Sequence, residues 1–67
     1  MNHLRIRRER AGLKQIELAL QAGVHPSLLC RYERGVRPSR RTAERLASAL
    51  GCTVQDLFAY PNALRRY

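Results

Sequence analysis

The segment from residue 13 to residue 35 constrains the fold more than any other part of the chain. It reads L-K-Q-I-E-L-A-L-Q-A-G-V-H-P-S-L-L-C-R-Y-E-R-G, two short amphipathic stretches that meet at Ala22-Gly23-Val24. Gly23 tolerates the positive φ that a tight turn between two helices requires. Pro26 suits a first helical turn, because its fixed φ and missing N–H are harmless there. The pattern therefore predicts helices over 15–22 and 26–34.

The two helices divide their residues between an apolar and a basic side. We expect seven apolar residues to face one small core: Leu13, Ile16, Leu18, Ala19, Val24, Leu29 and Tyr32. The opposite side of the second helix is left with Ser27, Cys30, Arg31 and Arg34. A helix whose outward face is small, polar and basic, braced across another helix, suits entry into a DNA major groove.

Glycine and capping residues mark three further helices. The first runs from about Asn2 to Ala11 and stops at Gly12, a suitable residue for a left-handed C-terminal cap. Ser39 caps a helix over 40–50 that ends at Gly51. Its core face follows the spacing i, i+3, i+4, i+7 at Ala43, Leu46, Ala47 and Leu50.

The last helix is short. Thr53 to Asp56 resembles a capping box with aspartate in place of glutamate, and it opens a helix that runs through Phe58. Pro61 prevents much continuation, so residues 61–67 are expected to form a tail. The sequence thus predicts an all-α, compact five-helix bundle in a single domain over residues 1–60.

The strongly positive charge of the chain limits the kinds of molecule that it is expected to bind. Lys and Arg number 13 against 5 Asp and Glu, which gives a formal net charge of +8. All but Lys14 of these cations are arginine, whose planar guanidinium suits phosphates and guanine edges. Ribosomal proteins, RNA binders and membrane-surface peptides share a basic composition, so charge is informative only beside the helical pattern.

Several kinds of site are not expected. No run approaches the ~20 apolar residues of a membrane span, and residues 1–5 contain no apolar signal core, so we expect a cytoplasmic protein without a membrane partner. Cys30 and Cys52 fall outside any metal-ligand spacing and are expected to be reduced thiols. His3 and His25 form no metal or catalytic pattern, and no nucleophile, base and orienting group assemble. We expect no enzyme, no metal and no cofactor.

Residues spread along the chain match one family in order and spacing. They are Gln15, Ala19, Gly23, Val24, Leu29, Glu33 and Gly35, with the fragments G-L-K-Q, E-R-G-V-R-P-S and L-A-S-A-L-G-C-T-V-Q-D-L-F. From about Leu4 onward, and apart from its last several residues, the chain resembles the lambda repressor/Cro-like helix-turn-helix proteins, the XRE family. The resemblance implies that residues 15–22 lie over the DNA backbone and that 26–34 form the recognition helix.

The resemblance also implies which residues read bases. Ser27 and Arg31 match positions that reach base edges, and their spacing of four independently places both on one helix face. For Arg31 the expected contact is guanine O6 and N7, with a solvated or phosphate-bound arginine as the alternative. Ser27 can instead satisfy a backbone N–H of its own helix. Pro26 offers only apolar contact, and Leu28 can touch a thymine methyl or cover the bundle edge.

A second set of residues is expected at the DNA backbone. It consists of Lys14, Gln15, His25, Arg34, Arg37, Arg40 and Arg41. In the family, the residue matching Gln15 contacts a phosphate or braces a base reader. Arginines at the start of a helix oppose its dipole, so phosphate contact explains the cluster at 34–41 better than a solvated basic rim does. His25 can bond a phosphate or base, or act as an ordinary helix cap.

One expected pair is structural. The family commonly joins an arginine on the first helix to a glutamate late in the recognition helix, and Arg8 and Glu33 match these positions. A carboxylate facing DNA phosphates would repel them, so Glu33 is expected to point inward and to need a partner. We expect this salt bridge to fix the angle of the recognition helix.

These observations favour sequence-specific double-stranded DNA binding by a small transcriptional regulator, a repressor, on a near-palindromic operator. A homodimer would use apolar residues near the C-terminus: Val54, Leu57, Phe58, Tyr60 and Leu64. The alternative is a protein-interaction module, such as an antitoxin or adaptor with the same fold. A nonspecific RNA binder is disfavoured, because such modules stack bases on exposed aromatic residues and none is expected on the recognition face.

Overall fold

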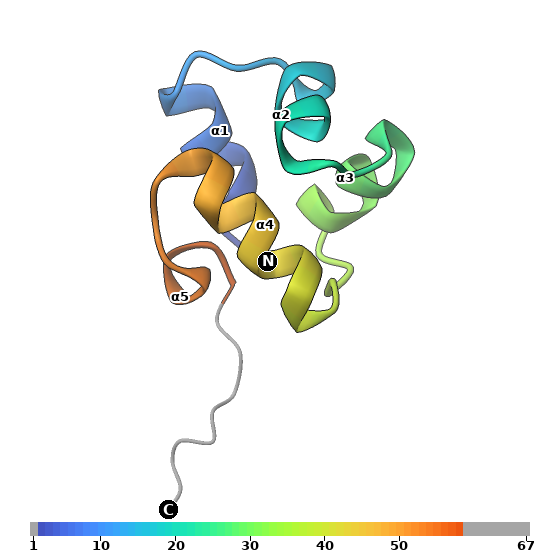
Figure 1. The fold of residues 1–67 in the computed structure, drawn as a ribbon, viewed down its shortest axis with the longest axis vertical. Coiled ribbons are helices and arrows are strands. Elements are labelled where there is room, and N and C mark those ends of the chain that lie inside the picture. Colours follow the sequence, from blue (N-terminus) through green and yellow to red (C-terminus); the bar gives the residue numbers. More distant parts are fainter. Residues whose placement is uncertain (1, 59–67) are drawn as a thin grey trace, which may run out of the picture.

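The turn at Gly23 organises the fold. In the computed structural model, which describes residues 2–58, Gly23 has φ 70° and ends helix α2, Gln15–Ala22. Helix α3, Pro26–Glu33, begins three residues later, with His25 as its N-cap residue. Figure 1 shows α2 and α3 side by side with a short connection. The predicted pair of helices joined by a tight turn is confirmed.

Three more helices complete the described chain: α1, Leu4–Arg10, α4, Arg40–Leu50, and α5, Val54–Leu57. Residues 2–58 contain no strand, so the all-α, five-helix prediction is confirmed. Helix α1 begins two residues later than predicted, because the Asn2 carbonyl Oδ1 accepts a hydrogen bond from the Leu4 N–H at 3.1 Å. Arg34 is the C-cap of α3 rather than its last helical residue.

Side chains cap the fourth and fifth helices as their sequences predict. Ser39 Oγ accepts a hydrogen bond from the Thr42 N–H at 3.3 Å. At α5, Thr53 Oγ1 accepts from the Asp56 N–H, and the Asp56 carboxylate accepts from the Thr53 N–H. These hydrogen bonds with Thr53 lower the pKa of Asp56 below its ordinary value. The caps define where α4 and α5 start.

The core lies between α2, α3, α4 and the ends of the described chain. It is formed by Leu4, Leu18, Ala19, Ala22, Leu29, Ala43, Leu46, Ala47, Leu57 and Phe58. Leu13, Val24, Tyr32 and Leu50 are partly buried against it. The prediction for Ile16 is wrong, since its side chain is 56% exposed. It lies one turn before Leu20, on the outer face of α2, away from Leu18.

Of the apolar residues expected at a dimer surface, those that the structure describes pack into or against the core. Leu57 and Phe58 are 1% and 3% exposed because they close the core beneath α4, and Val54 packs against the same cluster. The predicted dimer surface is therefore wrong for Leu57 and Phe58. Tyr60 and Leu64 lie outside the described residues. The His3 N–H also donates to the Leu57 carbonyl at 2.9 Å, which ties α5 to the start of α1.

Both cysteines are free thiols that are half-buried. Cys52 packs against the core, and burial raises its pKa. Among the described residues, no group of histidine, cysteine and acidic side chains has a metal-binding arrangement. No helix in residues 2–58 is both long and apolar enough to cross a bilayer.

The opposite exposures of Leu18 and Ile16 give a direct test of the core. Leu18→Ala should lower the free energy of unfolding by about 2–5 kcal/mol, because it leaves a cavity at a fully buried site. Ile16→Ala removes a similar volume from an exposed site and should change the free energy of unfolding by less than about 0.5 kcal/mol. Urea denaturation followed by circular dichroism measures both. Equal losses would show that Ile16 belongs to the core.

Candidate nucleic-acid interface

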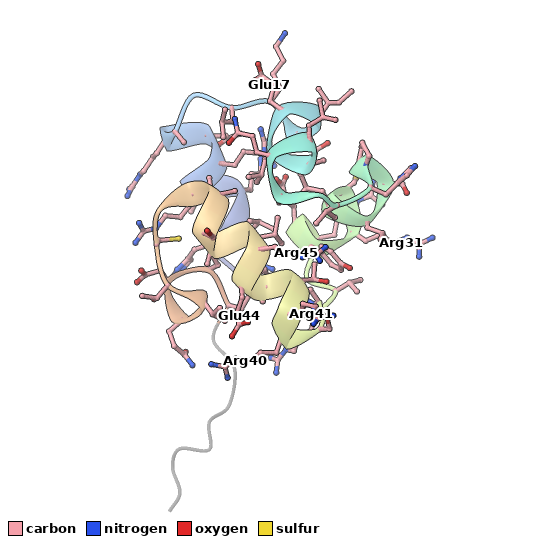
Figure 2. The ribbon with its side chains drawn as sticks, in the orientation of Figure 1. Glu17, Arg31, Arg40, Arg41, Glu44 and Arg45 are labelled. Carbon is pink, nitrogen blue, oxygen red and sulfur yellow. The ribbon has the colours of Figure 1, made fainter. Side chains whose placement is uncertain are left out.

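Helix α3 presents a polar, basic face to solvent. Ser27, Arg31 and Arg34 are exposed and follow the spacing i, i+4, i+7, so they share one side of the helix. Leu29, on the opposite side, is fully buried. Figure 2 shows Arg31 pointing away from the body of the protein. We call Ser27, Arg31 and Arg34 the recognition face.

The other two candidate base readers border this face near its N-terminal end. Leu28 is 39% exposed, and Pro26 is half-buried at the first position of α3. Pro26 has neither an N–H nor a side-chain donor, so it can supply apolar contact only. The arrangement places a small apolar surface beside the hydroxyl of Ser27.

His25 and Ser27 are connected at the N-terminus of α3. The imidazole Nδ1 of His25 accepts a hydrogen bond from the Ser27 N–H at 3.2 Å, so the histidine side chain is a true N-cap. The same Nδ1 lies 2.8 Å from Ser27 Oγ. Sequence reasoning gave capping as one of two roles for His25 and did not foresee its link to the hydroxyl.

The start of α2 lies on one flank of the recognition face. Lys14 is exposed at the N-cap position of α2, and the Glu17 carboxylate accepts a hydrogen bond from its backbone N–H at 2.7 Å. The Gln15 amide points inward instead, and its Nε2 donates to Glu33 Oε1 at 2.9 Å. At this flank the exposed charged side chains are therefore Lys14 and Glu17, beside the first backbone N–H groups of α2, which have no partner within the helix.

The loop before α4 and the start of that helix form the other flank. Arg37, Arg40 and Arg41 are exposed there, together with the N-terminus of α4. Arg40 forms a solvent-exposed ion pair with Glu44, with 3.5 Å between Nε and Oε2. An exposed pair of this kind contributes little to stability, so Arg40 can exchange its partner for a phosphate at small cost.

Arg45 extends this flank and was missed by sequence reasoning. Its Nη1 would lie 3.9 Å from a Cβ placed on Gly23, so the guanidinium sits beside the turn between α2 and α3. Figure 2 shows Arg41 and Arg45 on the same side of α4. The spacing of four residues from Arg41 is the signal that could have identified it.

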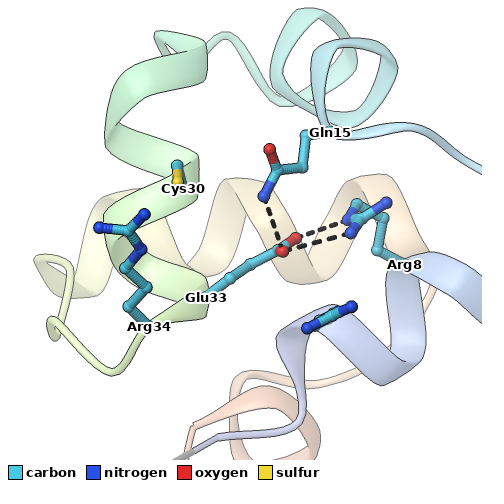
Figure 3. A pocket seen from close by; sticks show the side chains of 6 residues that line it. Arg8, Gln15, Cys30, Glu33 and Arg34 are labelled. Atoms are coloured by element: carbon cyan, nitrogen blue, oxygen red, sulfur yellow. Dashed lines mark hydrogen bonds and ion pairs between the residues drawn. The ribbon is translucent and has the colours of Figure 1, made fainter.

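A buried polar network holds α3 in place. Arg8 Nε and Nη2 donate to the two carboxylate oxygens of Glu33, the second at 3.2 Å. Arg8 Nη1 also donates to the Leu13 carbonyl at 2.7 Å. With the Gln15 amide bonded to the same carboxylate, three helices meet at Glu33 (Figure 3). The two charged side chains are 11% and 5% exposed.

The contact with Glu33 favours the charged form of Arg8. The hydrogen bond to Glu33 raises the pKa of Arg8 above its ordinary value, although burial acts in the opposite direction. No buried side-chain nitrogen or oxygen in the described residues lacks a hydrogen-bond partner. A second brace comes from Asn2, whose Nδ2 donates to the Tyr32 carbonyl at 2.7 Å. The Arg8–Glu33 contact fixes the C-terminal half of α3 against α1, and the Asn2 contact fixes it against the segment that precedes α1.

A shallow depression opens above Glu33. Its volume is about 290 Å³, and it is lined by Arg5, Arg8, Gln15, Cys30, Glu33 and Arg34. Arg34 lines the depression (Figure 3) and also belongs to the recognition face. Three arginines against one glutamate leave the lining positively charged, so it can attract an anionic oxygen.

The combination of these features defines a class of protein. Two short helices meet at a left-handed glycine, and the second exposes a basic face while buried polar contacts fix its angle. This is the architecture of a helix-turn-helix domain, whose second helix enters the major groove.

Comparison with known proteins agrees with this classification. A helix-turn-helix family model matches residues 4–57, and the chain therefore belongs to the lambda repressor-like (XRE) helix-turn-helix family. It is a family of DNA-binding regulators. No curated protein matches the chain.

Two glutamates allow a matched test of the buried network. Glu33→Ala leaves Arg8 buried without its partner and should lower the free energy of unfolding by about 3–5 kcal/mol. Glu9→Ala removes the partner of Arg5 from an exposed i,i+4 pair and should cost less than about 1 kcal/mol. Chemical denaturation of both variants measures the difference. Similar losses would mean that the buried pair does not hold α1 and α3 together.

Proposed function

We propose that the protein is a small transcriptional regulator, a repressor, that binds double-stranded DNA sequence-specifically in the cytoplasm. The observation that carries this proposal is the recognition face: an exposed basic surface on a helix whose other side is fixed by the Arg8–Glu33–Gln15 network. A helix must be held at a defined angle for its side chains to meet the same base edges in every complex. The network supplies that rigidity.

In the proposed complex, α3 lies in the major groove. Arg31 donates two hydrogen bonds to guanine O6 and N7, the commonest specific contact of an arginine. Ser27, one turn earlier, reaches the neighbouring base edge. Leu28 and Pro26 supply apolar contact, which suits the methyl group of thymine.

The two flanks would contact the phosphates that border the groove. Figure 2 places Glu17 of α2 and Arg40 of α4 toward opposite ends of the view, with Arg31 between them. On the first flank we assign phosphate contacts to Lys14 and the backbone N–H of Gln15. The imidazole of His25, at the N-terminal end of α3, is assigned a separate phosphate contact. On the second we assign them to the exposed arginines of the loop and α4. Arg34 reaches a phosphate at the edge of the depression above Glu33.

The proposed repression requires only that the protein occupy its DNA site. A domain that covers a promoter excludes polymerase without needing any further activity, and two copies on adjacent half-sites would read a near-palindromic operator. Because Leu57 and Phe58 are core residues, such a pair would have to use other surface.

Selection from randomised duplexes tests the function itself. The full chain should enrich a defined site, and the selected sequence should show two related half-sites if two copies bind. The competing interpretation, nonspecific attraction between a +8 chain and polyanions, predicts no enrichment at all. Absence of a selected sequence at moderate salt would therefore reject the regulator.

One observation favours a second function, a protein-interaction module such as an antitoxin or adaptor. Ile16 and Leu20 lie one turn apart on α2 and are 56% and 77% exposed. Exposed apolar side chains on a helix can dock against another protein. If DNA selection fails, Leu20→Glu should abolish association with a partner protein; if DNA selection succeeds, this variant should retain the selected sequence.

Arg31 and Arg41 should behave differently when replaced, because base contacts carry sequence information and phosphate contacts do not. Arg31→Ala should cost about 1–3 kcal/mol on the selected site and relax a guanine preference at one position per half-site. Arg41→Ala should weaken binding on all duplexes and reduce the slope of log K against log salt by about 1. Fluorescence anisotropy on selected and random duplexes measures both. Equal losses on both duplexes for Arg31→Ala would make Arg31 a phosphate contact.

A further inference from the structure

The hydrogen bonds between His25 and Ser27 determine where two protons lie. Nδ1 accepts from the Ser27 backbone N–H at 3.2 Å, so Nδ1 carries no proton in this structure and presents its lone pair. Ser27 Oγ lies 2.8 Å from the same nitrogen. Two lone pairs at this distance would repel each other, so the hydroxyl proton must point at Nδ1.

The direction of this hydrogen bond fixes what Ser27 offers to a ligand. A serine hydroxyl has one proton and two lone pairs, and it normally rotates to donate or accept as its partner requires. Here the proton is committed to His25. The exposed side of Ser27 Oγ therefore presents lone pairs alone and behaves as a hydrogen-bond acceptor.

Acceptor character discriminates among bases in the major groove. Adenine N6 and cytosine N4 present amino donors there, whereas guanine O6 and N7 and thymine O4 are acceptors. A hydroxyl that can only accept a hydrogen bond therefore binds the amino groups of adenine and cytosine and repels the acceptor atoms of guanine and thymine.

We propose that His25 is a specificity-determining residue of the interface. It holds Ser27 as an acceptor, so that α3 selects adenine or cytosine on the strand that Ser27 contacts. The inference rests on the proposed function, since it assumes that α3 enters the major groove. His25 acts as a positioning residue here, and its role is separate from the guanine contact of Arg31.

The same bonds leave the other imidazole nitrogen available. A neutral imidazole carries one proton, and with Nδ1 acting as an acceptor that proton is on Nε2. Nε2 is then a donor at an exposed residue at the N-terminus of α3. A donor at this place suits a phosphate oxygen, so capping, orientation of Ser27 and a backbone contact are compatible roles for a single side chain.

The experiment is selection from randomised duplexes with the full chain and three variants. Ser27→Ala should remove one preference per half-site and so identify the position that Ser27 reads. At that position the native chain should favour adenine or cytosine by about fivefold, the worth of one net hydrogen bond. His25→Gly frees the hydroxyl to rotate, so this preference should fall to within about twofold. Glycine is tolerated at an N-cap at a cost of a few tenths of a kcal/mol relative to capping side chains.

His25→Asn is the matched control. An asparagine at this position keeps an uncharged acceptor, its Oδ1, at the N-cap and should again receive the Ser27 proton, so the adenine or cytosine preference should be retained. Circular dichroism melts confirm that each variant is folded. The inference is overturned if His25→Gly keeps the preference, if the native chain favours guanine or thymine there, or if Ser27→Ala changes no position. If the native chain enriches no site at all, both the proposed function and the inference about His25 fail.

Discussion

The buried ion pair between Arg8 and Glu33 sets the position of α3 against α1. It joins α1 to the last turn of α3, and the Gln15 amide connects the same carboxylate to the start of α2. Removing two charges from water costs nearly as much free energy as their attraction returns, so such a pair adds little to net stability. Its main consequence is geometric. The planar guanidinium and the carboxylate meet through two hydrogen bonds, which permits one relative orientation of the two helices.

That orientation explains how α3, a helix of eight residues, can both pack against the protein and expose a basic face. Leu29 and Glu33 lie one turn apart and face the protein, so the exposed side of α3 is left to Ser27, Arg31 and Arg34. A helix with a single bonded end could pivot about the turn at Gly23. The polar network at Glu33 and the Asn2 contact to Tyr32 hold the other end. The recognition face is consequently rigid, as direct readout of base edges requires.

Much of the fold could be predicted because its signals are local. Gly23 and Gly51 have left-handed conformations that end α2 and α4, and Ser39 and Thr53 cap helices through their own side chains. These effects depend on a few adjacent residues. Ile16 was assigned to the wrong side because apolar character alone does not say which face of a short helix turns inward. Only the neighbouring helices decide that question.

The details of the site depended on contacts distant in sequence. Gln15 and Glu33 are 18 positions apart, and a glutamine at a helix start can bond a phosphate as readily as a carboxylate. Arg45 is brought beside Gly23 by the packing of α4 on α2. The bond between His25 and Ser27 is local. However, a histidine at an N-cap has two ring nitrogens, and the sequence does not determine which of them faces Ser27. For these residues the side-chain contacts are known only from the structure, because the sequence pattern does not determine them.

We propose that a rigid α3 presents one face to DNA, and an NMR titration of the labelled protein with a duplex shows which residues contact it. The backbone amide signals of Ser27, Arg31 and Arg34 and the Nε signals of the two arginines should shift most, with smaller changes at the starts of α2 and α4. Signals of the Arg8 and Glu33 pair should stay in place, because the network persists in the complex. Largest shifts on the outer face of α2, around Ile16 and Leu20, with α3 unperturbed, would contradict this proposal.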